Sequence, residues 1–301
     1  MKWKCIILFL IREEKQIEEN IVNNENISIK EKLIYIENEL NEKKNSFKKE
    51  MKKEEIIFAI SLKSKKVSNN WSIIEENLGR TLRSILNNTQ KNFRIIIAGH
   101  EKPSINELKN KKVEWISAQF PPPVNSKGFT NDKMKKRKLI GVYLRKGGFS
   151  GYIMPLDADD LIHFRFVEYI NSEPFYEAFI INQGYLSNFY LNEFWLVDKF
   201  YKYCGSCSVI YFSNSMLPKS PRINSKFFSR LTLSRHPKII SHLRQCKVNY
   251  KMINLPVVFR CFGHGENNML FKKTLNLSVS AKDYRTQGEE IEKWIYDYFK
   301  C

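Results

Sequence analysis

The first half of the chain alternates short apolar runs with stretches of helical periodicity. Strands are predicted at residues 56–60, 93–98, 113–116 and 152–156, and helices at 73–87 and 132–146. This order predicts an α/β fold with a mostly parallel sheet and helices on both faces. Ligands bind such sheets outside the carboxyl ends of the strands. The segments after the first, second and fourth strands are therefore expected to converge at one site.

The second half is less regular. Strands are predicted at residues 178–181, 194–197, 208–212 and 257–262, and a basic segment over 220–245 is helical in its latter part. The spacing of apolar residues predicts a last helix over 281–300. No run approaches the roughly 20 apolar residues that cross a bilayer.

Charge separates residues 1–55 from the rest of the chain. This segment holds twelve Lys/Arg and twelve Asp/Glu, so residues 56–301 carry the whole net charge of +18. Its thinly spaced apolar residues predict a charged helical N-terminal extension, followed by a folded domain over 56–301. The basic excess fits attraction to a nucleotide diphosphate, to an anionic membrane surface or to nucleic acid.

The fourth strand stops at three carboxylates. Asp157 and Asp159 would point to the same side of an extended chain, where one Mg²⁺ or Mn²⁺ could bridge them and grip a diphosphate. An alternative is that the acids cap a following helix over 161–169, with Asp160 as its N-cap. The cap does not explain the pairing of Asp157 with Asp159.

The six cysteines do not form a secreted disulfide framework, which favours a cytoplasmic protein. Cys204 and Cys207 form a Cys-x-x-Cys pair, but no second pair accompanies them. We interpret both as small residues that lead into the strand over 208–212, in preference to a zinc or redox site.

The order of these parts resembles a family 2 glycosyltransferase with the GT-A fold. The likeness covers about residues 55–268 and rests on four pieces: the strand and loop over 56–71, the segment Thr81-Leu-Arg-Ser-Ile-Leu-Asn-Asn-Thr89 before the second strand, the triplet Asp157-Ala158-Asp159, and the late Gly-His-Gly-Glu-Asn267. The resemblance implies that Asp157 and Asp159 bind the cation of a nucleotide sugar, with Ala158 beside it. The resemblance also implies that His264 is a third contact to the metal or the phosphate. The alternative is that His264 is a surface-loop residue with no role in binding.

The remaining candidate residues lie at the same predicted edge. Ser61, Lys63 and Glu101 are expected to contact the nucleotide, with Glu101 in place of the acidic turn that usually reads the base. Lys133 and Arg137 are one helical turn apart and could face the diphosphate, although such a run is more often a solvated face.

The implied reaction transfers a sugar from a nucleotide-sugar donor to a hydroxyl of a glycan or lipid-linked acceptor, with peripheral attachment to an anionic membrane as a further expectation. An inverting enzyme needs a base, for which Glu266 is the first candidate and Asp198 the second.

Two alternatives stay open. A basic nucleic-acid-binding protein would use the charge together with aromatics such as Phe164, Phe166, Phe227 and Phe228, but no binding motif is present, so no nucleic-acid partner is expected. A GT-A nucleotidyltransferase would need a glycine-rich, lysine-bearing loop after the first strand, which is missing.

Overall fold

Seven strands form the central sheet in the order β10-β6-β9-β4-β1-β2-β3. The computed structural model describes residues 53–301, apart from 223–224, 234, 272 and 274–276, so most of the predicted N-terminal extension lies outside the described residues. The strands are β1 (Ile56–Ser61), β2 (Phe93–Gly99), β3 (Val113–Ser117), β4 (Gly151–Leu156), β6 (Ala178–Ile181), β9 (Ser208–Phe212) and β10 (Tyr250–Ile253). All adjacent pairs are parallel except those that include β9.

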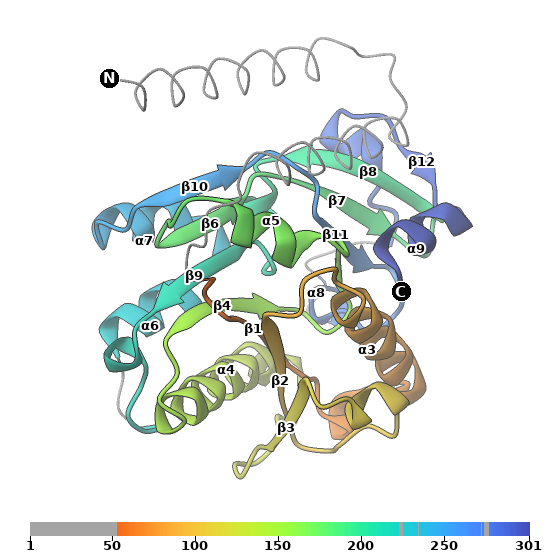
Figure 1. Ribbon diagram of the computed structural model, residues 1–301. Coiled ribbons are helices and arrows are strands. Elements are labelled where there is room, and N and C mark those ends of the chain that lie inside the picture. Colours follow the sequence, from red (N-terminus) through yellow and green to blue (C-terminus); the bar gives the residue numbers. More distant parts are fainter. Residues whose placement is uncertain (1–52, 223–224, 234, 272, 274–276) are drawn as a thin grey trace, which may run out of the picture. The chain divides into compact units, whose positions relative to one another are not determined.

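Helices cover both faces of this sheet, as Figure 1 shows for α3 and α4. Alternate residues of β1 point to opposite faces: Ile57 and Ala59 belong to the cluster of apolar residues under α4 (Phe129–Lys146), α6 (Lys226–Thr232) and α7 (Ile239–Gln245). Phe58 faces the other side and packs against Phe166 of α5 (Phe166–Ser172). The buried stripe of α3 (Trp71–Leu86) includes Leu78 and Leu82.

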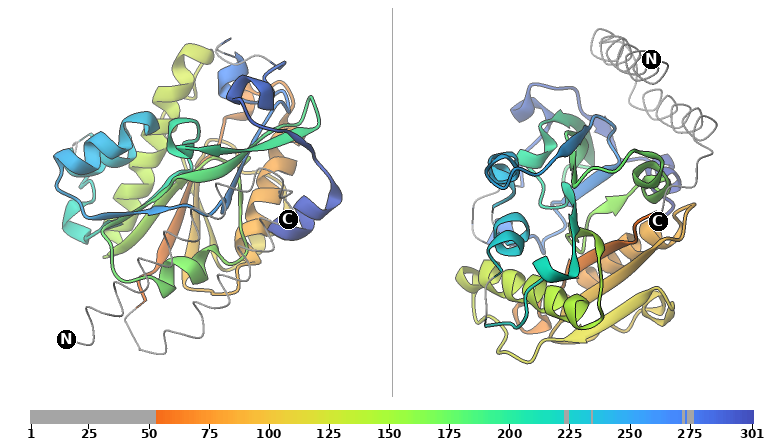
Figure 2. Two further views of the ribbon diagram at one scale, coloured as in Figure 1. Left: turned by 90° about the horizontal axis from the view of Figure 1, so that it is seen from above. Right: turned by 60° about the vertical axis from the view of Figure 1, so that its left-hand side comes forward.

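A second sheet has five strands in the order β12-β8-β7-β11-β5. Its strands are β5 (Leu161–Ile162), β7 (Gln183–Asn188), β8 (Glu193–Asp198), β11 (Val258–Phe262) and β12 (Glu289–Glu290), and the remaining helices are α8 (Asn268–Phe271) and α9 (Lys293–Phe299). Figure 2 shows the two sheets from two further directions. Because β4 belongs to the first sheet and β5 to the second, residues 157–160 form one of the connections between the two sheets, called the joint below.

The pairing between β4 and β9 ends before β4 reaches this joint. β9 pairs with β4 only from Gly151 to Ile153, while β1 continues alongside β4 to Leu156. Pro155 has no N–H to donate, so it fits a stretch that has a partner on one side only. Among the described strands, the carboxyl end of β4 is therefore paired with β1 only.

The structure confirms the predicted strands, the helices after the first and third strands, and the mostly parallel sheet with helices on both faces. The prediction of one helix over 281–300 is wrong, because a 3-10 turn (Ala281–Tyr284) and β12 precede α9. The alternative in which Asp160 caps a helix over 161–169 is also wrong, since Leu161 and Ile162 form β5 and the N-cap of α5 is Arg165. Among the described residues, no helix has the length and apolar character needed to cross a membrane.

Candidate functional site

Asp157 lies at the end of buried strand β4 and is paired with two cations from α4. Lys133 donates to Oδ1 of Asp157 at 2.5 Å, and Nη2 of Arg137 lies 3.6 Å from the same oxygen. Burial opposes the negative charge, but the two cations outweigh it and lower the pKa of Asp157 to about 2. Oδ2 of Asp157 accepts no hydrogen bond from a described residue and is left for another partner.

Asp159 is held by the loop that follows β11. Oδ2 of Asp159 accepts hydrogen bonds from His264 (2.9 Å) and Asn267 (3.0 Å). The amide N–H of Glu266 points at Nδ1 of His264, so in the neutral ring the hydrogen lies on Nε2 and is donated to Asp159. The second amide hydrogen of Asn267 goes to the carbonyl of Cys261. Oδ1 of Asp159 has no hydrogen-bond donor among the described residues.

Asp160 faces inward and is 1% exposed. Its carboxyl accepts hydrogen bonds from the Ser206 hydroxyl (2.5 Å), the Cys204 thiol (3.2 Å) and the amide of Cys261 (3.2 Å). Burial, followed by the charges of Asp159 and Asp157, raises the pKa of Asp160 to about 8. Asp160 therefore stabilises the joint through hydrogen bonds to buried residues and does not cap a helix.

The Cys-x-x-Cys segment also supports the acids. Cys204 and Cys207 are buried, and burial raises the pKa of both thiols, that of Cys207 to about 12. Ser206 between them accepts from the amide of Asp157 while it donates to Asp160. Sequence reasoning missed Ser206, because a serine ahead of a strand carries no signal that it will bridge two acids.

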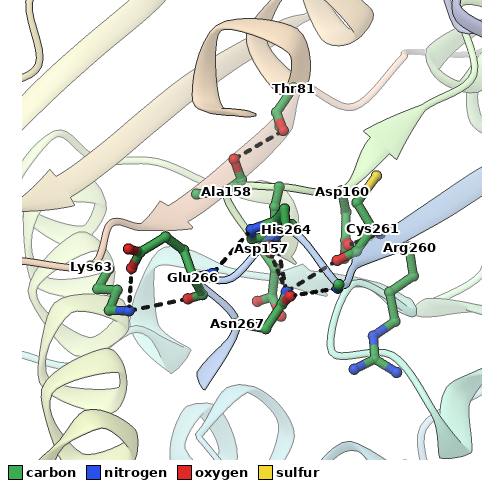
Figure 3. Close-up of polar contacts among 12 residues, drawn as sticks. Lys63, Thr81, Asp157, Ala158, Asp160, Arg260, Cys261, His264, Glu266 and Asn267 are labelled. Atoms are coloured by element: carbon green, nitrogen blue, oxygen red, sulfur yellow. Dashed lines mark hydrogen bonds and ion pairs between the residues drawn. The ribbon is translucent and has the colours of Figure 1, made fainter. Parts of the chain in front are cut away.

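Glu266 accepts hydrogen bonds on both carboxylate oxygens, and Figure 3 shows its contact with Lys63. Lys63 donates to Oε2 at 2.7 Å and to the Glu266 carbonyl at 3.1 Å, and the amide of Asn70 donates to Oε1 at 2.6 Å. The side chain of Glu266 is only 2% exposed. This predicted base thus ties the loop after β11 to the loop after β1.

Three other predicted nucleotide contacts lie around the same loops. Ser61 donates to the carbonyl of Lys133 at 3.3 Å, and the carbonyl of Ala158 accepts from Thr81 at 3.1 Å. Glu101 accepts from the hydroxyl of Ser64 and the amide of Lys65. Ser61 and Ala158 line the cleft described below, whereas Glu101 is not among its lining residues.

Asp198 lies elsewhere. It is exposed at the end of β8, accepts a hydrogen bond from Gln183 at 2.9 Å and does not line the cleft. The structure therefore does not bring this second candidate base to the acids.

A cleft of about 420 Å³ opens in front of Asp157 and Asp159. Its cationic lining comes from the loop after β1, from α4, from the segment between α6 and α7 and from β11: Lys63, Lys133, Arg137, Arg235 and Arg260. Arg137 is 7% exposed, and its Nε and Nη2 form no hydrogen bond with a described residue, although Nη2 lies 3.6 Å from Oδ1 of Asp157. The sequence does not identify Arg235 and Arg260 as site residues, because neither lies within a recognisable motif.

The acids fit a divalent cation. No cluster of three or more His, Cys, Asp or Glu side chains with a metal-binding arrangement occurs among the described residues. The open oxygens of Asp157 and Asp159 nevertheless offer two hard ligands, and Mg²⁺ commonly takes one or two carboxylates and completes its shell with water and phosphate. Gly205 leaves room there, because a Cβ at that position would lie 3.4 Å from Oδ2 of Asp157. His264 fits less well, since its Nε2 carries the hydrogen that it donates to Asp159.

The aromatics named for the nucleic-acid alternative do not form an exposed stacking surface. Phe166 and Phe228 are core residues that are 0% and 2% exposed. Phe227 packs against Phe212, and the Lys300 ammonium lies over the ring of Phe164. Base stacking needs accessible rings, so these four residues do not favour that alternative.

No protein-family model and no curated protein matches this chain. Among solved structures, the chain is similar to the glycosyltransferase GlyE of Streptococcus pneumoniae TIGR4, with 12% identity, a TM-score of 0.36 and coverage of 77% of this chain and 63% of GlyE. The apo form of GlyE is 11% identical, with a TM-score of 0.35 and coverage of 77% of this chain and 63% of GlyE. HddC from Yersinia pseudotuberculosis is 13% identical, with a TM-score of 0.35 and coverage of 66% of this chain and 88% of HddC. The chain thus spans less than two thirds of the length of GlyE.

Proposed function

We propose that this protein is a glycosyltransferase that uses a nucleotide-sugar donor and a hydroxyl acceptor, either a glycan or a lipid-linked sugar. The observation that carries the proposal is that Asp157 and Asp159 each keep an open carboxylate oxygen on a cleft lined by five Lys and Arg residues. A diphosphate bound through a cation needs this combination of hard oxygen ligands and surrounding positive charge.

Asp157 and Asp159 would hold Mn²⁺ or Mg²⁺, which when bound neutralises charge on the leaving diphosphate. Arg137 supports the same role, since its Nε and Nη2 are buried at the cleft and have no hydrogen-bond acceptor in the described part of the chain. Lys133 is placed beside Asp157 and would shift between the carboxylate and a phosphate oxygen. Fixed cations at the position where charge develops stabilise the departing nucleoside diphosphate.

The two ends of the cleft suggest how the substrates lie. Ser61 and Ser64 line it beside the carboxyl end of β1, where a nucleoside would sit in a parallel sheet. Leu233 and Arg235 line it from the segment between α6 and α7, which leaves that side for the acceptor. The net charge of +18 favours an anionic acceptor surface, such as a membrane that carries a lipid-linked sugar.

Calorimetric titration tests the proposal. UDP, GDP, CDP and ADP are titrated into the wild-type protein with and without Mn²⁺, and we expect at least one to bind in a cation-dependent manner. Asp159→Asn should weaken that binding at least about tenfold, which corresponds to about 1.4 kcal/mol. Asp198→Asn is the matched control and should bind like the wild type. Lack of binding by all four nucleotides, or full binding by Asp159→Asn, contradicts the proposal.

A further inference from the structure

His236 is a cleft residue that the proposed reaction has not yet used. It begins a 3-10 turn (His236–Lys238) between α6 and α7, next to another such turn (Phe200–Lys202). His236 and Tyr203 both line the cleft that holds Asp157. The ring is therefore on the side of the cleft that the nucleoside does not occupy in the proposed arrangement.

The hydrogen bond to Tyr201 fixes the form of the imidazole. Nδ1 of His236 lies 2.9 Å from the carbonyl oxygen of Tyr201. A carbonyl only accepts, so Nδ1 carries the hydrogen and Nε2 of the neutral ring carries a lone pair. No described residue donates to Nε2. Burial lowers the pKa of His236, which keeps this lone pair available at neutral pH.

The charged groups around the ring act in both directions on its pKa. Arg260 on β11 and Lys133 on α4 lower it, whereas the Tyr201 carbonyl and Asp157 raise it. Arg235 precedes the ring on its own segment and Lys238 follows it. The carbonyl at Nδ1 would stabilise an imidazolium once a proton is taken up.

The carboxylates of the cleft are committed to other partners. Glu266 is bound by Lys63 and the Asn70 amide, Asp157 is paired with Lys133, and Asp160 is buried under three donors. Asp157 and Asp159 each keep one open oxygen, and the proposed function assigns both of these oxygens to the cation. Nε2 of His236 thus remains as an uncommitted proton acceptor among the described lining residues.

We propose that His236 is the general base of the transfer, with Nε2 taking the proton of the acceptor hydroxyl. The acceptor oxygen forms a bond to the anomeric carbon, the bond from that carbon to the diphosphate oxygen breaks, and its electron pair leaves with the nucleoside diphosphate. The proton ends on Nε2 and passes to solvent after the product leaves. A single displacement of this kind inverts the configuration of the anomeric carbon. This role rests on the proposed glycosyltransferase function.

The test uses hydrolysis of UDP-glucose, UDP-N-acetylglucosamine or GDP-mannose in Mn²⁺, with water as the acceptor. Burial lowers the pKa of His236, so we expect the acid limb of the wild-type rate to lie below the ordinary histidine pKa of about 6.5, where the base becomes protonated. His236→Gln should lower kcat about 100-fold, abolish this acid limb and leave nucleoside diphosphate affinity unchanged. His242→Gln carries the same substitution on α7, outside the cleft lining, and should behave like the wild type.

Further measurements separate a chemical role from a structural one. Added imidazole should restore part of the rate to His236→Ala, and nitrogen NMR of the wild type should find the Nδ1–H form of His236. The Nε2–H form, or an unchanged rate and pH profile in a wild-type-like binder, overturns the role of His236 alone. If the wild type neither binds nor hydrolyses any of these nucleotides, the proposed function fails as well.

Discussion

Lys63 and Glu266 are 203 positions apart in the chain, yet their side chains form an ion pair at 2.7 Å with exposed fractions of only 12% and 2%. The pair joins the loop after β1 to the loop after β11, and the latter loop also holds Asp159 through His264 and Asn267. The position of Asp159 therefore depends on a contact between two loops that are far apart in the chain.

Loss of Glu266 should act on stability more than on proton transfer. Glu266→Ala removes the carboxylate to which Lys63 and the amide of Asn70 donate, and removal of one member of a buried pair costs about 3–5 kcal/mol. Denaturant unfolding measures the loss. Glu266→Gln keeps an acceptor for one of the two donors and should be less destabilising.

The pH profile then tests the base assignment independently. Under conditions where Glu266→Gln is folded, its rate of donor hydrolysis should keep the acid limb of the wild type. Disappearance of that limb in Glu266→Gln would show that Glu266, as first expected from the sequence, is the base.

Arg137 should contribute to diphosphate affinity. Arg137→Lys removes the buried Nε and Nη2 donors, which have no hydrogen-bond acceptor among residues that the structure describes. UDP or the preferred nucleotide should therefore bind about 10- to 100-fold more weakly, a loss of about 1.4–2.8 kcal/mol. The corresponding nucleoside, which lacks phosphates, should show no change. Arg145→Lys is the matched control on the same helix, because Arg145 donates to the carbonyls of Asn214, Ser215 and Leu217. Equal losses in both variants would contradict a specific phosphate contact.

Asp160 should make the protein less stable as the pH rises. Its folded pKa of about 8 exceeds the ordinary value of 3.8, so between these values the folded protein holds a proton that the unfolded chain has lost. The free energy of unfolding therefore falls with rising pH, by up to about 1.4 kcal/mol per pH unit. Urea unfolding between pH 6.5 and 8 measures this slope, and Asp160→Asn should flatten it. Mn²⁺ should flatten it too, because a cation beside Asp157 and Asp159 lowers the pKa of Asp160.

His163 should make the protein less stable as the pH falls, which is the opposite of the effect of Asp160 and occurs at lower pH. The ring is 0% exposed, and burial lowers its pKa from 6.5 to about 3. Between these values the unfolded chain binds a proton and the folded protein does not, so stability is lost as the pH falls through this range. His163→Phe keeps the aromatic contacts with Tyr298 and Phe164 and should flatten the dependence between pH 4 and 6.5. The same slope in His163→Phe as in the wild type would contradict this account.

The sequence predicts the parallel half of the fold well because its signals are local. An apolar run that stops at Asp157 identifies a buried strand and its ligand end, and the periodicity of residues 73–87 identifies α3. In the second sheet β8 and β11 are predicted, but β5 and β12 are not, since they have two residues each and owe their strand form to pairing with β11 and β8. Strands that short have no periodicity.

The site residues that can be predicted from the sequence are also those with a local signal. Asp157, Asp159 and Arg137 follow from a motif and from helical spacing, and all three line the cleft. The commitment of Glu266 to Lys63 does not follow from sequence, because it depends on contact between distant loops. His236 is similarly inconspicuous, since only the neighbouring Tyr201 carbonyl fixes its hydrogen on Nδ1.

Residues 157–160 connect β4 of the first sheet to β5 of the second. A cation or nucleotide that binds both Asp157 and Asp159 would therefore hold a segment that links the two sheets. We expect the amide protons of β4 and β11, which belong to different sheets, to exchange more slowly with solvent when it is bound.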